Sequence, residues 1–232
     1  MPQFLILRLD GPMQAWGTHT FEDFRPVNAF PTRSGLLGLL GACLGIERQD
    51  KVSQQALAES IELTVRVDET APRIEAKAED DNGQWARKTA MKQTDYHTVL
   101  NARKVDGSTN KYPIESHREY LFDAAFTVAV GNRAEPAVTL STLLEAMCRP
   151  AFTPTLGRRS CPLGRPLLDP SALIEATDAI AALAKIEPIG GTIYAEGDLI
   201  SDLPLQLRDV PAYGERRQFN NRRIYVHKES PS

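Results

Sequence analysis

The chain has 232 residues, 42% of them hydrophobic, which is enough for one large domain or for one domain with a small appendage. Its formal net charge of −3 argues against a free-standing nucleic-acid binder, because neutralising phosphates needs clustered cations. The three cysteines are an odd set without metal-ligand spacing, so the sequence predicts neither a zinc site nor a disulfide framework. We expect no metal and no cofactor.

The N-terminal apolar run, Phe4 to Leu9, is too short for a membrane span and lacks the basic start and cleavage site of a signal peptide. We therefore expect a cytoplasmic protein with no membrane partner. Positive charge is dense in the C-terminal third, at Arg158, Arg159 and Arg165 and again between Arg216 and Arg223. These clusters leave open that the chain binds nucleic acid inside a larger assembly.

The first third of the chain alternates strand and helix patterns. The patterns predict an apolar strand over residues 4–9, a turn over 10–12 and a long loop over 13–30. A helix over 34–46, a short helix over 53–60 and an alternating strand over 62–68 follow. Thr32 or Ser34 is a suitable N-cap for the first helix.

The middle of the chain adds a polar insertion. Residues 70–118 are charged and weakly periodic, and this stretch is too long for a plain connection, so it predicts a protruding thumb hairpin or a disordered segment. Strand character returns over 120–130, a helix fits 140–147, and a last strand is expected over 151–156. This order matches a ferredoxin-like split βαβ, so we predict an α+β fold with a ferredoxin-like domain over residues 1–156.

The tail, residues 157–232, predicts a smaller, mainly β unit. A helical pattern covers 171–184, and β-like segments follow at 192–194, 203–208 and 222–227.

The predicted helix over residues 34–46 is rich in glycine. Each glycine in a helix interior costs about 1 kcal/mol relative to alanine, so something must offset the cost. Gly38, Gly41 and Gly45 form one flat stripe, which favours tight packing of the helix on a sheet over a ligand-facing surface.

The start of this helix is a candidate phosphate site. Thr32, Arg33 and Ser34 place hydroxyls, a guanidinium and free N–H groups at the positive end of the helix dipole. Simple capping by Thr32 or Ser34 explains the same residues equally well.

Two loops elsewhere carry further candidates for RNA contacts. Gln14 and Trp16 follow the first strand, where glutamine can bond a base edge and tryptophan can stack on an unpaired base, although a lone tryptophan is more often a core residue. The second loop combines a glycine, paired guanidiniums and a hydroxyl suited to bidentate phosphate contacts, unless it is a solvated turn with a structural ion pair. Its residues are Gly157, Arg158, Arg159 and Ser160.

The polar insertion supplies groups for RNA contact or for metal-free RNA cleavage. Aromatic and imidazole rings offer stacking faces, and cations offer phosphate contacts, whereas catalysis also needs a base, an acid and a charge stabiliser held together. No spacing ties these residues into a catalytic pair, which favours RNA binding. The candidates are Tyr96, His97, Arg103, Lys104 and Arg118.

Several long segments, in the same order, resemble one family. They include Gly-Pro-Met-Gln-Ala-Trp-Gly from Gly11 to Gly17, Asp-Tyr-His-Thr-Val-Leu from Asp95 to Leu100, and Thr-Pro-Thr-Leu-Gly-Arg-Arg-Ser-Cys-Pro-Leu from Thr153 to Leu163. The segment from Phe30 to Ile46 also matches. On these residues the chain resembles the CasD-type subunits of type I-E CRISPR Cascade complexes, in the RAMP superfamily. The resemblance covers most of residues 4–165.

This resemblance implies an RNA-recognition-like fold with a thumb hairpin. It also implies a non-catalytic subunit that binds the 5′ repeat-derived handle of the crRNA and caps the backbone filament in antiviral defence. The implied partners are the crRNA, the Cascade backbone subunit, the Cascade large subunit and, indirectly, the target DNA. Because a related subunit of another CRISPR subtype cuts RNA, a metal-independent endoribonuclease stays the alternative. The segment from Ala76 to Lys92 is longer than the family pattern, which leaves the length of the thumb open.

Overall fold

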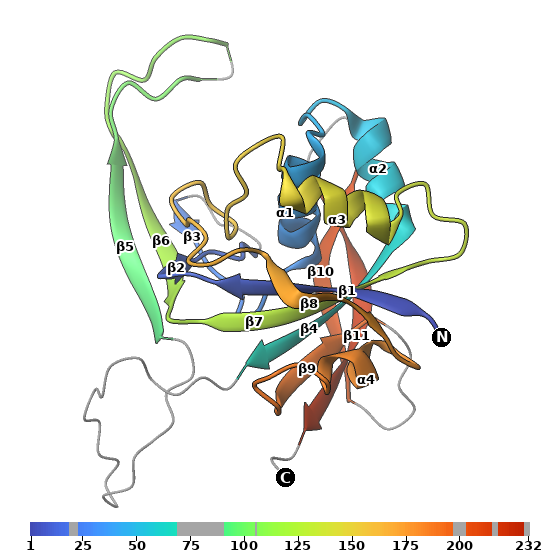
Figure 1. Cartoon of the computed structure of the whole chain (residues 1–232). Helices are drawn as coiled ribbons and strands as arrows, with labels where there is room; N and C mark the ends of the chain where they lie inside the picture. Colours follow the sequence, from blue (N-terminus) through green and yellow to red (C-terminus); the bar gives the residue numbers. More distant parts are fainter. Residues whose placement is uncertain (19–22, 69–90, 105, 197–202, 215–217, 230–232) are drawn as a thin grey trace, which may run out of the picture.

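The computed structural model describes residues 1–18, 23–68, 91–104, 106–196, 203–214 and 218–229. The fold mixes helices and strands and is mostly sheet (Figure 1). A seven-stranded sheet has the order β10-β11-β9-β4-β7-β1-β8, and all its neighbouring strands are antiparallel. Its strands are β10 (Leu203–Ala212), β11 (Gln218–Glu229), β9 (Gly191–Ala195), β4 (Ile61–Asp68), β7 (Ala125–Asn132), β1 (Gln3–Asp10) and β8 (Leu168–Glu175).

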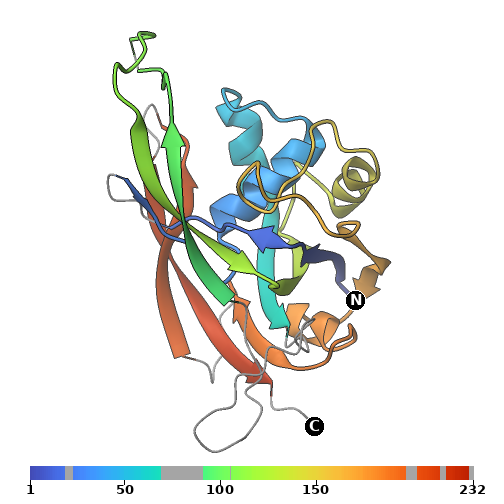
Figure 2. The same cartoon turned by 90° about the vertical axis from the view of Figure 1, so that its left-hand side faces the viewer.

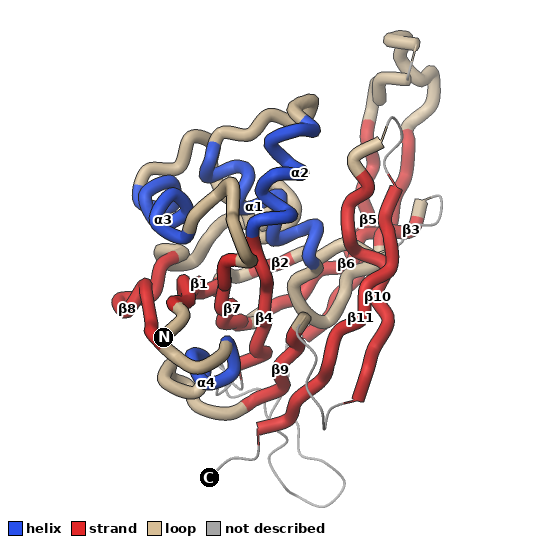
Figure 3. The backbone as a smooth tube through the Cα atoms, turned by 90° about the vertical axis from the view of Figure 1, so that its right-hand side faces the viewer, coloured by secondary structure: helices blue, strands red, loops and turns tan. Residues whose placement is uncertain are grey.

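The centre of this sheet is buried on both faces, which explains the unbroken apolar run of β1. Leu5, Leu7 and Leu9 join the larger core cluster with residues of α1 (Arg33–Leu44), α2 (Lys51–Ser60) and α3 (Leu140–Cys148). Ile6 faces the opposite side and packs with residues of the short helix α4 (Ala179–Leu183). Figure 3 shows α1, α2 and α3 together and α4 apart from them.

A second sheet has the order β2-β6-β3, with β5 paired to β6. Its strands are β2 (Met13–Gln14), β3 (Phe24–Arg25), β5 (Met91–Val99) and β6 (Ile114–Phe122). β5 and β6 form a hairpin in register from Met91 opposite Phe122 to Val99 opposite Ile114. The hairpin extends away from the body of the molecule (Figure 2). The part of the predicted insertion over residues 70–90, with most of the segment from Ala76 to Lys92, lies outside the described residues.

Local signals in the first helix are confirmed. Thr32 is the N-cap of α1, and its hydroxyl accepts from Gly35 N–H. Gly45 ends the helix with φ of 75°, a conformation that favours glycine.

Three predicted elements differ from the structure. The predicted strand over 120–130 is two strands, because Asp123 has φ of 53° and turns the chain between β6 and β7. No strand forms over 151–156, and β8 pairs with β1 in its place. The predicted helix over 171–184 is strand as far as Glu175 and helical only in α4. Backbone pairing with β1 outweighs the helix propensity of this segment.

The predicted boundary at residue 156 stays a prediction. Strands from both sides of it share one sheet, because β8 pairs with β1 and β9 pairs with β4. Among the described residues, no helix is long and apolar enough to cross a membrane.

Candidate nucleic-acid interface

A groove runs along one face of α1. It consists of two adjoining cavities, a near chamber of about 700 Å³ and a far chamber of about 590 Å³. Both chambers are lined by Ser34, Gly38 and Ala42 of α1 and by Gln218 and Phe219 of β11. We call the two chambers together the α1 groove.

Small residues make the floor of this groove. A Cβ atom on Gly38 would have nothing within 4 Å, and one on Gly41 would meet its nearest neighbour at 3.9 Å. The interpretation of tight helix-on-sheet packing is therefore wrong at Gly38, which faces open space. Of the glycines in and at the end of this helix, only Gly35, against the Trp16 ring, and Gly45, against Ala151, are closely packed.

Cations dominate the charged lining of the groove. Arg25, Arg158 and Arg208 line the near chamber, and Arg48 and Lys51 line the far chamber. Within the described part of the chain, the one carboxylate in either lining is Asp209, to which Arg222 donates from Nε and Nη2 at 2.6 and 2.7 Å. The groove therefore carries unneutralised positive charge, although the whole chain has a net charge of −3.

Arg158 is held in place by three groups. Its guanidinium donates to Glu119 O at 2.9 Å and to Arg25 O at 3.0 Å, and it lies 4.7 Å from the centre of the Tyr120 ring. These acceptors are neutral, so the charge stays available to a phosphate while its position is fixed. Arg158 thus links the near chamber to the base of the β5–β6 hairpin.

Gly157 allows two backbone segments to meet. It has φ of 93°, and a Cβ atom there would lie 1.9 Å from Ala15 O. The neighbouring Leu156 carbonyl accepts from Ala15 N–H at 2.9 Å. Only glycine fits this position, so its role is to shape the wall of the near chamber.

The start of α1 does not form the predicted phosphate site. Asp209 Oδ2 already accepts from Arg33 N–H at 2.7 Å, so a carboxylate of the chain occupies the positive end of the helix. The Arg33 side chain is buried and donates to Glu196, to Ala58 O and to Ile61 O. Arg33 is therefore structural, Thr32 is a buried cap, and Ser34 alone of the three contributes a partly exposed side chain to the groove.

Gln14 and Trp16 are core residues, which corrects the expectation of base contacts. Both side chains are 0% exposed. The Gln14 amide donates to Leu9 O and Ala124 O at 3.1 and 2.7 Å and accepts from Trp16 Nε1 at 2.9 Å. With every strong polar group satisfied and no ring face exposed, neither side chain can bind a base in this structure.

Of the predicted residues on the hairpin, His97 lies beside Tyr120, the ring that the Arg158 guanidinium covers. His97 Nε2 lies 2.9 Å from Asp95 Oδ2 and 3.3 Å from the Tyr120 hydroxyl. Tyr96 is 53% exposed on the same strand, and its ring centre is 5.3 Å from that of His117. Arg118 is half-buried and donates to Ser116 Oγ at 3.0 Å.

Charged side chains fix the base of the hairpin to the body. Burial raises the pKa of Glu119, but the Val27 N–H, Lys92 and Arg158 outweigh it and hold the pKa below its usual value. Glu119 is therefore ionised, and it binds Val27 N–H at 2.9 Å and Lys92 at 3.0 Å. These contacts tie β5 and β6 to the segment that follows β3.

Ten of the fourteen predicted residues lie outside the groove, and four of these ten are exposed loop residues. Arg103 and Lys104 are exposed in the loop at the tip of the hairpin, and Arg159 and Ser160 are exposed beyond Arg158. Sequence reasoning missed Arg25, Arg208, Arg48, Lys51 and Phe152, which belong to different segments and follow no local motif. The described residues contain no group of three or more histidine, cysteine or acidic side chains that could hold a metal ion.

Comparison with known proteins identifies the family of this chain. The model of the family CRISPR-associated protein (Cas_Cas5) matches residues 4–226. The CRISPR system Cascade subunit CasD of Escherichia coli (strain K12) is 47% identical over 230 residues, which cover 98% of this chain and 97% of that protein.

Two solved structures have similar folds. A chain of a CRISPR RNA-guided surveillance complex has a TM-score of 0.70 at 26% identity, and the alignment covers 97% of this chain and 89% of that one. A Cas protein known from a crystal structure has a TM-score of 0.60 at 28% identity, with 97% and 93% covered. The resemblance found in the sequence is confirmed, and the chain belongs to the family of CRISPR-associated proteins described as Cas_Cas5.

Proposed function

We propose that this chain is a non-catalytic subunit of a type I-E CRISPR surveillance complex that binds the 5′ repeat-derived handle of the crRNA in the α1 groove. The observation that carries the proposal is the groove itself. Among the residues that the structure describes, its lining has five cations and one carboxylate that Arg222 already binds, in a chain of net charge −3. A single strand of RNA needs such a charged path for its phosphates.

The strand order supports a ferredoxin-like, RNA-recognition-like core. β1, α1 and β4 are followed by β7, α3 and β8, and the four strands lie in the order β4-β7-β1-β8. This is the arrangement of a split βαβ. In the proposal, the β5–β6 hairpin is the thumb, with Arg158 at its base as the first phosphate contact.

The partners follow from the relatives. CasD of Escherichia coli is named as a Cascade subunit, and the similar solved chain is part of an RNA-guided surveillance complex. We propose that this chain caps the filament of backbone subunits, contacts the large subunit, reaches target DNA through the complex and acts in the cytoplasm.

The test is to purify the complex through this chain and to sequence the RNA that accompanies it. A repeat-derived small RNA is expected with the wild type. Arg158→Ala should lower the RNA content, because it removes a fixed cation of the near chamber, whereas Arg159→Ala is the matched control outside the groove. Absence of RNA from the wild-type preparation would refute the proposed function, and equal losses in both variants would refute the role of Arg158.

The endoribonuclease stays the second candidate, because Asp95, His97 and Tyr120 form a row beside the Arg158 guanidinium. A base, a phenol and a cation are the groups that metal-free RNA cleavage uses. Against it, the Tyr120 side chain is 3% exposed, so an RNA strand does not reach the middle of the row. Incubating the chain with precursor repeat RNA in EDTA should give no 2′,3′-cyclic phosphate, and a product that His97→Ala abolishes would establish the enzyme.

A further inference from the structure

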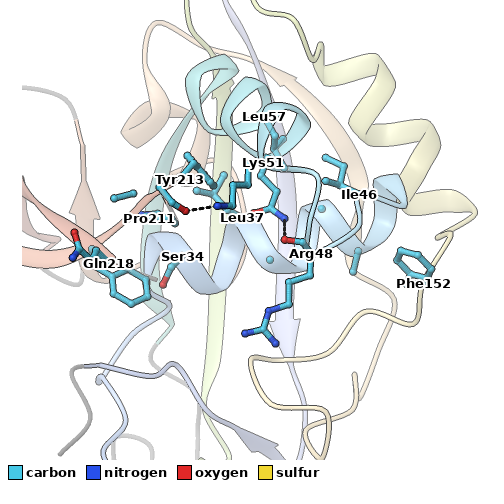
Figure 4. Close-up of a pocket in the computed structure, with 17 residues that line it drawn as sticks. Ser34, Leu37, Ile46, Arg48, Lys51, Leu57, Phe152, Pro211, Tyr213 and Gln218 are labelled. Atoms are coloured by element: carbon cyan, nitrogen blue, oxygen red, sulfur yellow. Dashed lines mark hydrogen bonds between the residues drawn. The ribbon is translucent and has the colours of Figure 1, made fainter. Parts of the chain in front are cut away.

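The far chamber of the α1 groove has the dimensions of a ligand site. Its volume is about 590 Å³, within the range of pockets that hold small ligands or parts of larger ones. Figure 4 shows Ser34 and Gln218 at one end of it and Ile46 and Phe152 at the other, with Leu37, Lys51 and Arg48 between them. The chamber therefore extends along α1 rather than into the core.

Three elements build this chamber. Gly38 and Gly41 of α1, Leu57 of α2, and Pro211 and Tyr213 near the end of β10 all line it. The Lys51 ammonium donates to Gly214 O and so joins the start of α2 to the segment after β10. The shape is thus set by contacts between residues far apart in the chain.

The lining of the far chamber combines an exposed aromatic ring with exposed cations. Phe152 is 48% exposed and borders the chamber, so its ring is accessible to a ligand there. Arg48 and Lys51 are exposed cations on the same lining, which has no carboxylate among its described residues. A ring for stacking beside cations suits one class of ligand, a nucleotide with its base unpaired.

The far chamber is also continuous with the near chamber. The two share Ser34, Gly38, Ala42, Gln218 and Phe219, so a strand that leaves the near chamber crosses α1 at Gly38. At this crossing nothing of the protein lies within 4 Å of the position a Cβ atom would take. Ribose and base can therefore approach the helix backbone there.

We propose that the far chamber receives one or two unpaired nucleobases of the same RNA strand whose phosphates the near chamber binds. The Phe152 ring supplies a stacking face, Gln218 supplies an amide for a base edge, and Arg48 and Lys51 bind the adjoining phosphates. The inference rests on the proposed function, because it assigns a place to bases of the RNA proposed above.

The test places a side chain at Gly38, where it should block the RNA strand without destabilising the fold. In Gly38→Ala and Gly38→Leu, the new side chain enters open space, and both residues favour a helix more than glycine does. The variants should therefore unfold at a temperature equal to or above that of the wild type. RNA affinity of the purified complex should fall progressively, by about tenfold for leucine. Val52→Leu on α2, at a side chain 82% exposed and outside both chambers, is the matched control.

A second measurement uses crosslinking in the wild-type complex. Repeat RNA carrying 4-thiouridine in place of uridine should crosslink to Phe152 or Tyr213, which line the far chamber and not the near one, under ultraviolet light, and Gly38→Leu should abolish the crosslink.

The possible outcomes separate the two proposals. Complexes without any RNA would refute the proposed function itself. Complexes that keep RNA at wild-type affinity in Gly38→Leu, with crosslinks confined to the near chamber, would refute the far chamber alone. Loss of a partner protein with RNA affinity unchanged would show that a protein segment occupies the chamber, which also overturns the inference.

Discussion

At the scale of single residues, Gly157 gives the sharpest prediction. Its φ of 93° and the 1.9 Å approach of Ala15 O leave no room for a side chain. Gly157→Ala should lower the free energy of unfolding by about 3 kcal/mol, because the residue or its neighbour must leave this conformation. Urea denaturation measures the change. Gly17→Ala, where a Cβ atom meets nothing within 4 Å, should change stability by less than about 0.5 kcal/mol, and equal effects would contradict the argument.

Cys43 gives a prediction about pH. Burial raises the pKa of its thiol from 9.0 to about 11. Between these values the unfolded chain loses the thiol proton and the folded chain keeps it, so stability falls as the pH rises through this window. The loss by pH 11 is about 2 kcal/mol at 1.36 kcal/mol per pKa unit. The stability difference between wild type and Cys43→Ala should therefore shrink from pH 8 to pH 11, and a constant difference would refute the assignment.

Residue roles were the hardest to predict from the sequence. The signals around Thr32 were local, so its capping role was one of the two that the sequence allowed. Arg33, in contrast, binds Glu196 at a separation of 163 residues, and Gln14 binds Ala124 O at a separation of 110. No pattern near Arg33 or Gln14 indicates that such partners exist. The sequence therefore predicted RNA contacts for Arg33 and Gln14, although the fold buries both side chains.

At the scale of elements, the loop at the tip of the hairpin can be tested independently of the body. The described hydrogen bonds of this loop stay within it, such as Lys104 N–H to Ser108 O at 2.7 Å. Replacing residues 100–113 by Asn-Gly, between the paired Val99 and Ile114, should leave the unfolding temperature unchanged. RNA retention by the complex should fall, because Arg103 and Lys104 are removed.

The matched variant keeps the loop and changes its charge. If the two cations hold RNA, Arg103→Ala with Lys104→Ala should lower RNA retention as much as the deletion does. Retention unchanged in both proteins would show that the tip contributes nothing to RNA binding.

The type of an element could be predicted from the sequence wherever the local pattern was compatible with only one kind of secondary structure. The apolar run of β1, the alternation of β4 and the N-cap of α1 predicted those elements. β8 was mistaken for a helix because Ser171 to Ala176 has good helix propensity, while the hydrogen bonds that make it a strand come from β1, more than 160 residues earlier in the chain. The groove was missed for the same reason, since its cations come from separate loops and strands.

At the scale of the whole molecule, the net charge is negative whereas the groove is positively charged. We expect the isolated chain to bind repeat RNA weakly at physiological salt, because a net charge of −3 repels the strand beyond the groove. Assembly with partner subunits should raise the affinity. Tight, handle-specific binding by the isolated chain would contradict this expectation.

The salt dependence of RNA binding tests whether the affinity depends on the groove cations or on the net charge of the whole molecule. With five groove cations among the described residues, the groove should contribute about −3.5 to the slope of log affinity against log salt, at about −0.7 for each phosphate neutralised on a single strand. Arg158→Ala with Arg208→Ala should make the slope shallower by about 1.4. Arg149→Ala with Arg223→Ala removes the same charge from exposed positions outside the groove and should leave the slope unchanged. Equal changes in the two pairs would mean that RNA responds to net charge alone, whereas a change confined to the first pair places the phosphates in the α1 groove.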